Sequence, residues 1–128
     1  LLAAGVNVAF GHDCVMDPWY GLGSGDMLEV AHMGLHVAQM TSQAGIRDAF
    51  DAVTTRAARA MGLADYGLEP GKPASFVLLQ ARDVSEAIRL RAPRLKVWRA
   101  GRLLAEGAPQ RLRIDLPGRT REVDFLRG

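Results

Sequence analysis

The residue with the clearest potential for chemistry lies near the start of the chain. Asp13 follows Gly11 and His12, directly after the mostly apolar run of residues 6–10. In α/β barrels the active sites gather at the carboxyl ends of strands, where a carboxylate can bind a divalent cation and can move a proton. Polar residues at strand ends also cap turns in many folds, so the residues alone leave a structural role for Asp13 open.

Two histidines further along the chain have a spacing that can bind a metal. His32 and His36 lie four residues apart and would share one face of a helix. The helical zinc-protease motif also needs a glutamate after the first histidine, and residue 33 is Met. We therefore interpret both histidines as structural. His12 receives the same interpretation, because successive side chains of a strand point to opposite faces.

The segments around Asp13 predict an α/β fold. Residues 1–5 are typical of the last turn of a helix that ends at Gly5. Residues 6–10 are typical of a strand buried on both faces of a parallel sheet. A parallel strand needs neighbours, and the first residue is not Met, so we expect this chain to be the C-terminal part of a larger protein.

Two helices are predicted after a loop over residues 14–23. Ser24 is the expected N-cap of the first helix, which runs to about residue 40, because its hydroxyl can accept a hydrogen bond from a backbone N–H. Apolar residues at spacings of three and four predict the second helix over about 43–61. The first helix would bury an apolar face made of Met27, Leu28, Ala31, Leu35 and Ala38.

From about residue 67 the pattern changes to turns and short strands. We predict a strand over 74–79, a helix that starts with a capping box at 83–86 and ends near 90, a hairpin that turns at Ala100-Gly101, a strand over 110–116, and a weak strand or ordered tail with Val123, Phe125 and Leu126. This change divides the chain into residues 1–66 and residues 67–128.

Composition excludes several classes of protein. The chain has 128 residues, of which 48% are hydrophobic and 23% charged, as in one globular domain of ordinary size. No apolar run approaches the length needed to span a bilayer. Cys14 is the single cysteine, which excludes an internal disulfide and a four-cysteine zinc site. We therefore expect a cytoplasmic protein without membrane contact.

Charge is distributed unevenly along the chain. Residues 1–88 carry 5 basic and 10 acidic side chains, whereas residues 89–128 carry 11 basic and 4 acidic ones. The basic residues include Arg111, Arg113, Arg119 and Arg121, which could form a phosphate or nucleic-acid patch. They alternate with apolar residues and lack an aromatic stacking platform, which favours a solvated sheet face or a contact with acidic partner subunits over nucleic acid.

Several motifs together resemble a known family. The stretch Val-Ala-Phe-Gly-His-Asp at 8–13 and the Asp-Pro-Trp-Tyr segment at 17–20 are similar to the eighth barrel strand and following loop of the bacterial cytosine deaminases, which belong to the amidohydrolase superfamily. The similarity continues through parts of residues 27–74 and fades after about residue 100. Gly-Lys-Pro-Ala at 71–74 and the hairpin from Val97 to Gly101 match signatures that are general to the superfamily.

The resemblance implies a metal-dependent hydrolytic deamination of cytosine or a related amino-substituted nitrogen heterocycle, with release of ammonia. It implies that Asp13 is both a metal ligand and a proton shuttle for one divalent ion, zinc or iron. Trp19 matches the aromatic residue that lines the base pocket, and Cys14 stands where the family has a second acidic residue. The implied fold is α/β: residues 1–66 are the last strand and closing helices of a (β/α)8 TIM barrel, and residues 67–128 are part of a small β-sandwich domain.

The resemblance also defines what this chain would need from elsewhere. The family's His-x-His pair, its later histidine ligand and its catalytic glutamate have no match here. We therefore expect barrel strands 1–7 to come from the rest of the polypeptide, and this fragment alone to be inactive. The resemblance also leads us to expect a homo-oligomer. Because Cys14 departs from the family pattern, a deaminase or amidohydrolase of another base or a triazine stays an alternative. A non-catalytic subunit or binding module with a basic β surface is a second one.

Overall fold

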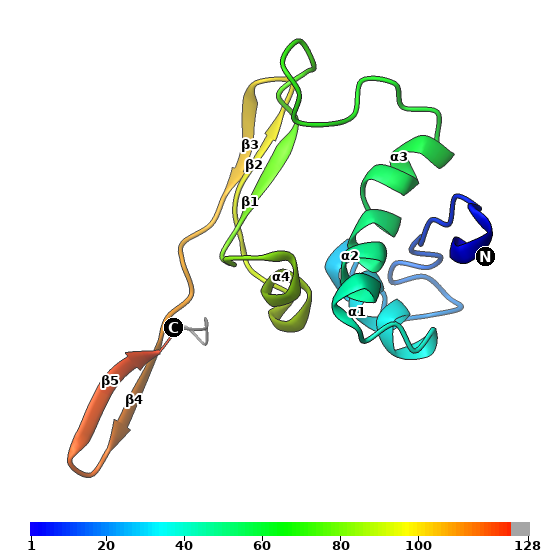
Figure 1. Cartoon of the computed structure of the whole chain (residues 1–128). Helices are drawn as coiled ribbons and strands as arrows, with labels where there is room; N and C mark the ends of the chain where they lie inside the picture. The colour runs from blue at the N-terminus through cyan, green and yellow to red at the C-terminus, as the bar shows by residue number, and fades with distance from the viewer. Residues whose placement is uncertain (124–128) are drawn as a thin grey trace.

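A computed structural model describes residues 1–123, except for the side chain of Thr120 (Figure 1). Among these residues, no helix has both the length and the hydrophobicity needed to cross a lipid bilayer. The elements in chain order are η1 (Leu2–Ala4), α1 (Met27–Val37), α2 (Gln43–Ala52), α3 (Thr55–Ala60), β1 (Phe76–Leu79), α4 (Val84–Leu90), β2 (Arg94–Arg99), β3 (Arg102–Glu106), β4 (Leu112–Leu116) and β5 (Arg119–Val123).

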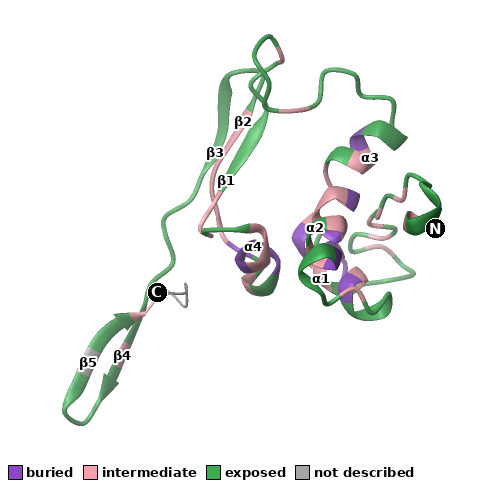
Figure 2. Ribbon diagram, in the orientation of Figure 1, coloured by how far each residue is buried: buried purple, intermediate pink, exposed green. Residues whose placement is uncertain are grey.

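The core lies where helices α1, α2 and α4 meet. Figure 2 shows the buried positions on these helices, whereas the strands are mostly exposed. Each helix buries one apolar stripe, as amphipathic helices do. Although α4 lies between β1 and β2 in sequence, it packs against α1 and α2 and so joins the two halves of the chain. The core residues are Leu28, Ala31, Leu35, Ala49, Ala87, Ile88 and Ala92.

The first helix begins later than predicted, and its cap differs. Asp26, not Ser24, is the N-cap: its Oδ1 accepts hydrogen bonds from the backbone N–H of Leu28 at 2.7 Å and of Glu29 at 3.4 Å. The Ser24 hydroxyl instead donates to a side-chain oxygen of Glu29. The predicted apolar face is confirmed at Leu28 and at two further positions of α1, but Ala38 is the exposed C-cap.

The second predicted helix is broken in two at Val53 and Thr54. Thr54 Oγ1 donates to the carbonyl of Phe50 at 2.7 Å, and such side-chain hydrogen bonds compete with helix continuation. The carbonyl of Ala52 accepts from the N–H of Phe10 at 2.9 Å rather than from the next helical turn. Contacts with the N-terminal segment therefore replace helical hydrogen bonds at the junction of α2 and α3.

The strand predicted over residues 6–10 does not form in the described structure. The turn before it is as predicted, because Gly5 ends η1 in the left-handed region with φ of 73°. No described strand lies beside residues 6–10, and a strand is defined by pairing with a neighbour. The segment is held by α2 and α3 instead, through Phe10 and through the Asn7 side chain, which donates to the Arg56 carbonyl at 3.0 Å.

All described strands pair in antiparallel fashion. Strands β1, β2 and β3 form one sheet in that order, and β4 pairs with β5 in a separate hairpin that extends away from the helices (Figure 1). The predicted turn at Ala100-Gly101 is confirmed: both residues have positive φ, which matches the twist of a tight hairpin. The expected helix 84–90 is confirmed too, with Asp83 as its N-cap. Phe125 and Leu126 lie outside the described residues.

Candidate functional site

The three residues singled out for chemistry lie around one hollow. Asp13, Cys14 and Trp19 belong to the loop between residue 10 and helix α1, and the hollow has a volume of about 780 Å³. Residues 9–14 line one side of it, and the face of α1 from Glu29 to Ala38 lines the other. A hollow of this size is large enough for a small planar ligand.

Asp13 has a carboxylate that is open to a ligand. The residue is exposed, and the hydrogen bond that it accepts comes from the Cys14 thiol at 3.8 Å, which is a weak donor. Over residues 1–123, no group of three His, Cys, Asp or Glu side chains lies close enough to hold a metal ion. The donors among the described residues therefore fit one position of a metal site, and the other positions need further ligands.

Cys14 lies among carboxylates that keep its thiol protonated. The neighbouring carboxylate of Asp17 is the largest influence that raises the pKa of the thiol, and burial and the charge of Asp13 raise it further. A thiolate is the reactive form of cysteine, so this environment is opposite to that of a nucleophilic cysteine. Cys14 therefore presents a neutral, weakly polar group to the hollow.

Asp17 organises the turn that carries Trp19. One carboxylate oxygen of Asp17 accepts hydrogen bonds from the backbone N–H of Trp19 at 2.9 Å and of Tyr20 at 3.0 Å. The neighbouring Cys14 thiol and these backbone donors hold the pKa of Asp17 below its usual range. The indole of Trp19 is 88% exposed. Sequence reasoning missed the role of Asp17, although an aspartate before proline is a known turn signal.

Two glycine contacts bring the ends of this loop together. The backbone N–H of Gly25 donates to His12 Nε2 at 3.3 Å, which agrees with a structural role for His12. Gly23 is buried against the backbone of Cys14: a Cβ on residue 23 would lie 1.9 Å from the Cys14 carbonyl oxygen. Residues 12–14 and 23–25 therefore form one packed unit.

Helix α1 also supports the segment that precedes Asp13. The ring of Phe10 packs on the helix at Gly34, where a Cβ would lie 2.5 Å from a ring carbon. The backbone of Phe10 is bound to α2 as described above. Phe10 is thus held on two sides, three residues before the candidate ligand.

His32 and His36 do not join the hollow. Their rings pack against each other with centroids 4.7 Å apart on α1. Burial is the largest influence that lowers the pKa of His32, and the charges of Arg91 and His36 lower it further. This arrangement agrees with a structural role for the pair.

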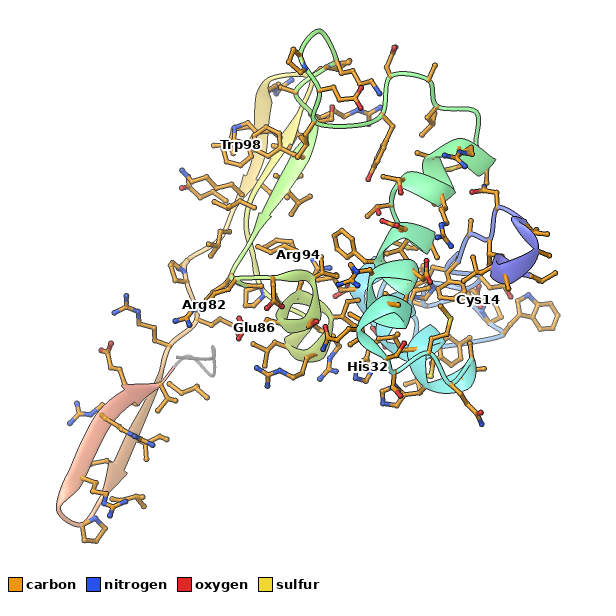
Figure 3. The ribbon with its side chains drawn as sticks, in the orientation of Figure 1. Cys14, His32, Arg82, Glu86, Arg94 and Trp98 are labelled. Carbon is orange, nitrogen blue, oxygen red and sulfur yellow. The ribbon has the colours of Figure 1, made fainter. Side chains whose placement is uncertain are left out.

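The charged residues of the β region form ion pairs. Arg94 of β2, which is labelled in Figure 3, makes a two-point ion pair with Asp26, the N-cap of α1. On the β4–β5 hairpin, Arg111 pairs with Glu122 at 3.1 Å, and Arg113 lies 4.0 Å from Asp115. These carboxylates neutralise part of the positive charge of Arg111 and Arg113. The pairing favours a solvated sheet face over a nucleic-acid patch for this hairpin.

A second hollow, of about 740 Å³, lies between the helices and the first sheet. Its lining is mostly apolar and includes Phe50, Tyr66 and Trp98, and no carboxylate of residues 1–123 contributes to it. Tyr66 could move a proton there, but no described carboxylate or histidine accompanies it to bind a cation, so the hollow at Asp13 is the better candidate for metal-dependent catalysis.

The chain is similar to known proteins both in sequence and in structure. Residues 1–105 match the family described as the amidohydrolase family. The N-isopropylammelide isopropyl amidohydrolase of Pseudomonas sp. strain ADP is 31% identical over 107 residues, which are 83% of this chain and 27% of that protein. The pterin deaminase of Rhizobium rhizogenes is 31% identical over 116 residues, which are 90% of this chain and 26% of that protein.

A solved structure is similar over nearly the whole chain. The crystal structure of 5-methylcytosine deaminase from Klebsiella pneumoniae, liganded with phosphonocytosine, has a TM-score of 0.80 and 37% sequence identity. The match covers 90% of this chain and 28% of that one. The present chain therefore spans little more than a quarter of the length of the proteins it matches.

Proposed function

The chain belongs to the amidohydrolase family, as its motifs predict, and we propose that it forms the C-terminal part of a metal-dependent enzyme that hydrolytically deaminates cytosine or a related amino-substituted nitrogen heterocycle. The observation that carries this proposal is the placement of Asp13, Cys14 and Trp19 around one hollow. The similarity to proteins named as deaminases of 5-methylcytosine and of pterin supports it.

Asp13 is the proposed catalytic residue. Its exposed carboxylate would provide one ligand to a divalent metal ion, zinc or iron, whose other ligands lie outside this chain. When bound, such a metal lowers the pKa of water so that hydrolysis can proceed near neutral pH. The carboxylate of Asp13 would take up the proton that this water loses, and would deliver it to the departing ammonia.

Trp19 and Cys14 are the proposed substrate-binding residues. The exposed indole of Trp19 offers a flat apolar face to a planar heterocycle. The thiol of Cys14, kept neutral by its carboxylate neighbours, would contact the ring edge as a weak donor. A heterocycle other than cytosine stays the alternative substrate. A neutral thiol at position 14 would favour a different pattern of hydrogen-bonding groups on the edge of the substrate ring than an acidic side chain would.

The proposed architecture follows from the same family assignment. Residues 1–66 would complete a (β/α)8 barrel, in which residues 6–10 gain the strand neighbours that they lack here. Residues 67–128 would contribute to a small β-sandwich domain. The rest of the polypeptide would supply barrel strands 1–7, and we expect a cytoplasmic homo-oligomer.

The role of Asp13 can be tested by substitution in the intact protein that contains these residues. Asp13→Asn keeps the size of the side chain but removes the negative charge and the basic oxygen, so turnover of cytosine should fall by several orders of magnitude. Release of ammonia and metal content would be measured on the same samples. A variant with near-normal turnover and metal content would refute the assignment.

The substrate-binding role is tested by two further variants. Trp19→Ala should lower kcat/KM strongly while the melting temperature stays unchanged, because the side chain is almost fully exposed. Cys14→Asp should change the order of preference among cytosine, 5-methylcytosine and other amino-heterocycles. If neither variant alters the ranking of substrates, this loop does not bind the substrate.

A further inference from the structure

The ion pair between Asp26 and Arg94 connects two distant parts of the chain. Both guanidinium nitrogens of Arg94 bind the carboxylate: Nη1 lies 2.8 Å from Oδ2, and Nη2 binds Oδ1. Arg94 Nη1 also contacts the carbonyl of Ala92, which braces the guanidinium at the start of β2. The side chains of Asp26 and Arg94 are 21% and 34% exposed, so water screens this pair less than a surface pair.

Asp26 has two tasks at once. It caps α1 through the backbone N–H groups of Leu28 and Glu29, and it binds Arg94 with the same carboxylate. Burial alone would raise the pKa of Asp26, but the hydrogen bonds from Arg94 and Leu28 outweigh burial and hold it below its usual range. The carboxylate of Asp26 is therefore ionised at neutral pH, and the negative charge favours both the helix cap and the ion pair with Arg94.

The neighbours of Asp26 extend this link to the candidate site. The N–H of Asp26 donates to Ser24 Oγ at 3.1 Å, and the preceding residue, Gly25, donates to His12 Nε2. Gly25 has φ of 72°, a conformation that glycine adopts at low cost. His12 precedes Asp13 directly. A continuous set of contacts thus runs from β2 through the start of α1 to the proposed metal ligand.

We propose that Arg94 and Asp26 are positioning residues for the loop that carries Asp13. Arg94 binds Asp26 and fixes residues 23–26, and these residues hold residues 12–14 through the Gly25–His12 hydrogen bond and the Gly23–Cys14 packing. Through Arg94, strand β2 would in this way control the geometry of the site without contacting the substrate. The catalytic consequence rests on the proposed function, whereas the positioning itself does not.

Two variants separate the ion pair from the helix cap. Asp26→Asn keeps an efficient N-cap, because an asparagine side chain also accepts from backbone N–H groups, but it loses the charge that binds Arg94. Arg94→Met removes the guanidinium and keeps most of the apolar stem. Lys96→Met is the matched control, because Lys96 lies two residues along β2 and makes an exposed ion pair with Glu106 at 3.0 Å.

The first measurement is hydrogen exchange by mass spectrometry in the intact protein. Both Asp26→Asn and Arg94→Met should speed exchange of the amides in residues 11–25 by about tenfold, while exchange in α2 and in β1–β3 stays unchanged. In the double variant these amides should exchange no faster than in either single variant, because the same ion pair is lost in all three proteins. Lys96→Met should leave the loop unchanged.

The second measurement is a kinetic comparison with cytosine as the probe substrate. Arg94→Met should lower kcat by about 10- to 100-fold with a smaller change in KM, because Asp13 lies in the packed unit of residues 12–14 and 23–25, whereas Asp17 separately holds the turn that carries Trp19. Arg94→Lys should recover part of this loss, since lysine restores the charge but not the two-point geometry.

Several results would overturn the proposal. The pair does not position the loop if the loop amides exchange at the same rate in Arg94→Met and in Lys96→Met. The same conclusion follows if exchange rises uniformly over the whole chain, or if the effects of Asp26→Asn and Arg94→Met on exchange add up in the double variant. If Asp13→Asn keeps its activity, the proposed function fails, but the exchange data still decide whether Arg94 holds the loop.

Discussion

The close approach of Gly23 to Cys14 makes a sharp prediction about the loop. Replacing Gly23 by Ala adds one methyl group whose carbon would lie 1.9 Å from the Cys14 carbonyl oxygen and 2.8 Å from the carbonyl carbon. Ordinary contacts of this kind begin at 3.4 Å, so the two backbone segments must separate by about 1.5 Å. The obstacle is backbone, which cannot turn away as a flexible side chain would.

The size of the effect follows from this separation. Forcing an extra methyl group into a packed site costs about 1–3 kcal/mol of the free energy of unfolding, and about 1 kcal/mol lowers the melting temperature by roughly 4–8 °C in a small domain and 2–4 °C in a larger one. A displacement of about 1 Å at a reacting group can reduce the rate about 100-fold. Since Cys14 follows Asp13, we expect Gly23→Ala to lower both the melting temperature and kcat/KM.

The matched control is a glycine two residues away. A Cβ on Gly21 would meet no atom within 4 Å, so Gly21→Ala should leave the melting temperature and turnover close to those of the natural protein. Both variants would be compared by differential scanning fluorimetry and by ammonia release. Equal behaviour of the two variants would show that the loop does not pack as described here, and the arrangement of Asp13, Cys14 and Trp19 would have to be abandoned.

Three further predictions concern the core, acid stability and metal binding. Ile88 is 1% exposed, so Ile88→Ala should destabilise the protein by about 2–5 kcal/mol in a denaturant titration, whereas Leu116→Ala, at a residue 56% exposed, should cost far less. Because the pKa of Asp26 is lowered in the folded state, its contribution to stability is full above about pH 4 and is lost as the pH falls through the folded pKa. The stability difference between the natural protein and Asp26→Asn should therefore shrink in acid denaturation series, and a constant difference would contradict the pKa. A polypeptide limited to residues 1–128 should bind zinc weakly in calorimetry, because residues 1–123 bring no three ligands together, and tight stoichiometric binding would refute this.

Local interactions made much of the chain predictable from its sequence. The left-handed stop at Gly5, the helix capped by Asp83 and the hairpin at Ala100-Gly101 each depend on residues within a few positions of one another. The family assignment was predictable for the same reason, because its motifs are short and contiguous. The positions of Asp13 and Trp19 on one loop followed from that motif, and their roles stay predictions.

Tertiary contacts decided the features that the sequence could not. Asp26 replaced Ser24 as the cap of α1 in a geometry that also binds Arg94, 68 residues later, and no local pattern signals such a partner. The helix predicted over 43–61 broke where the N–H of Phe10 takes the Ala52 carbonyl. Residues 6–10 have strand-like composition but lack a strand, because composition supplies the side chains of a sheet while pairing requires a neighbour in space.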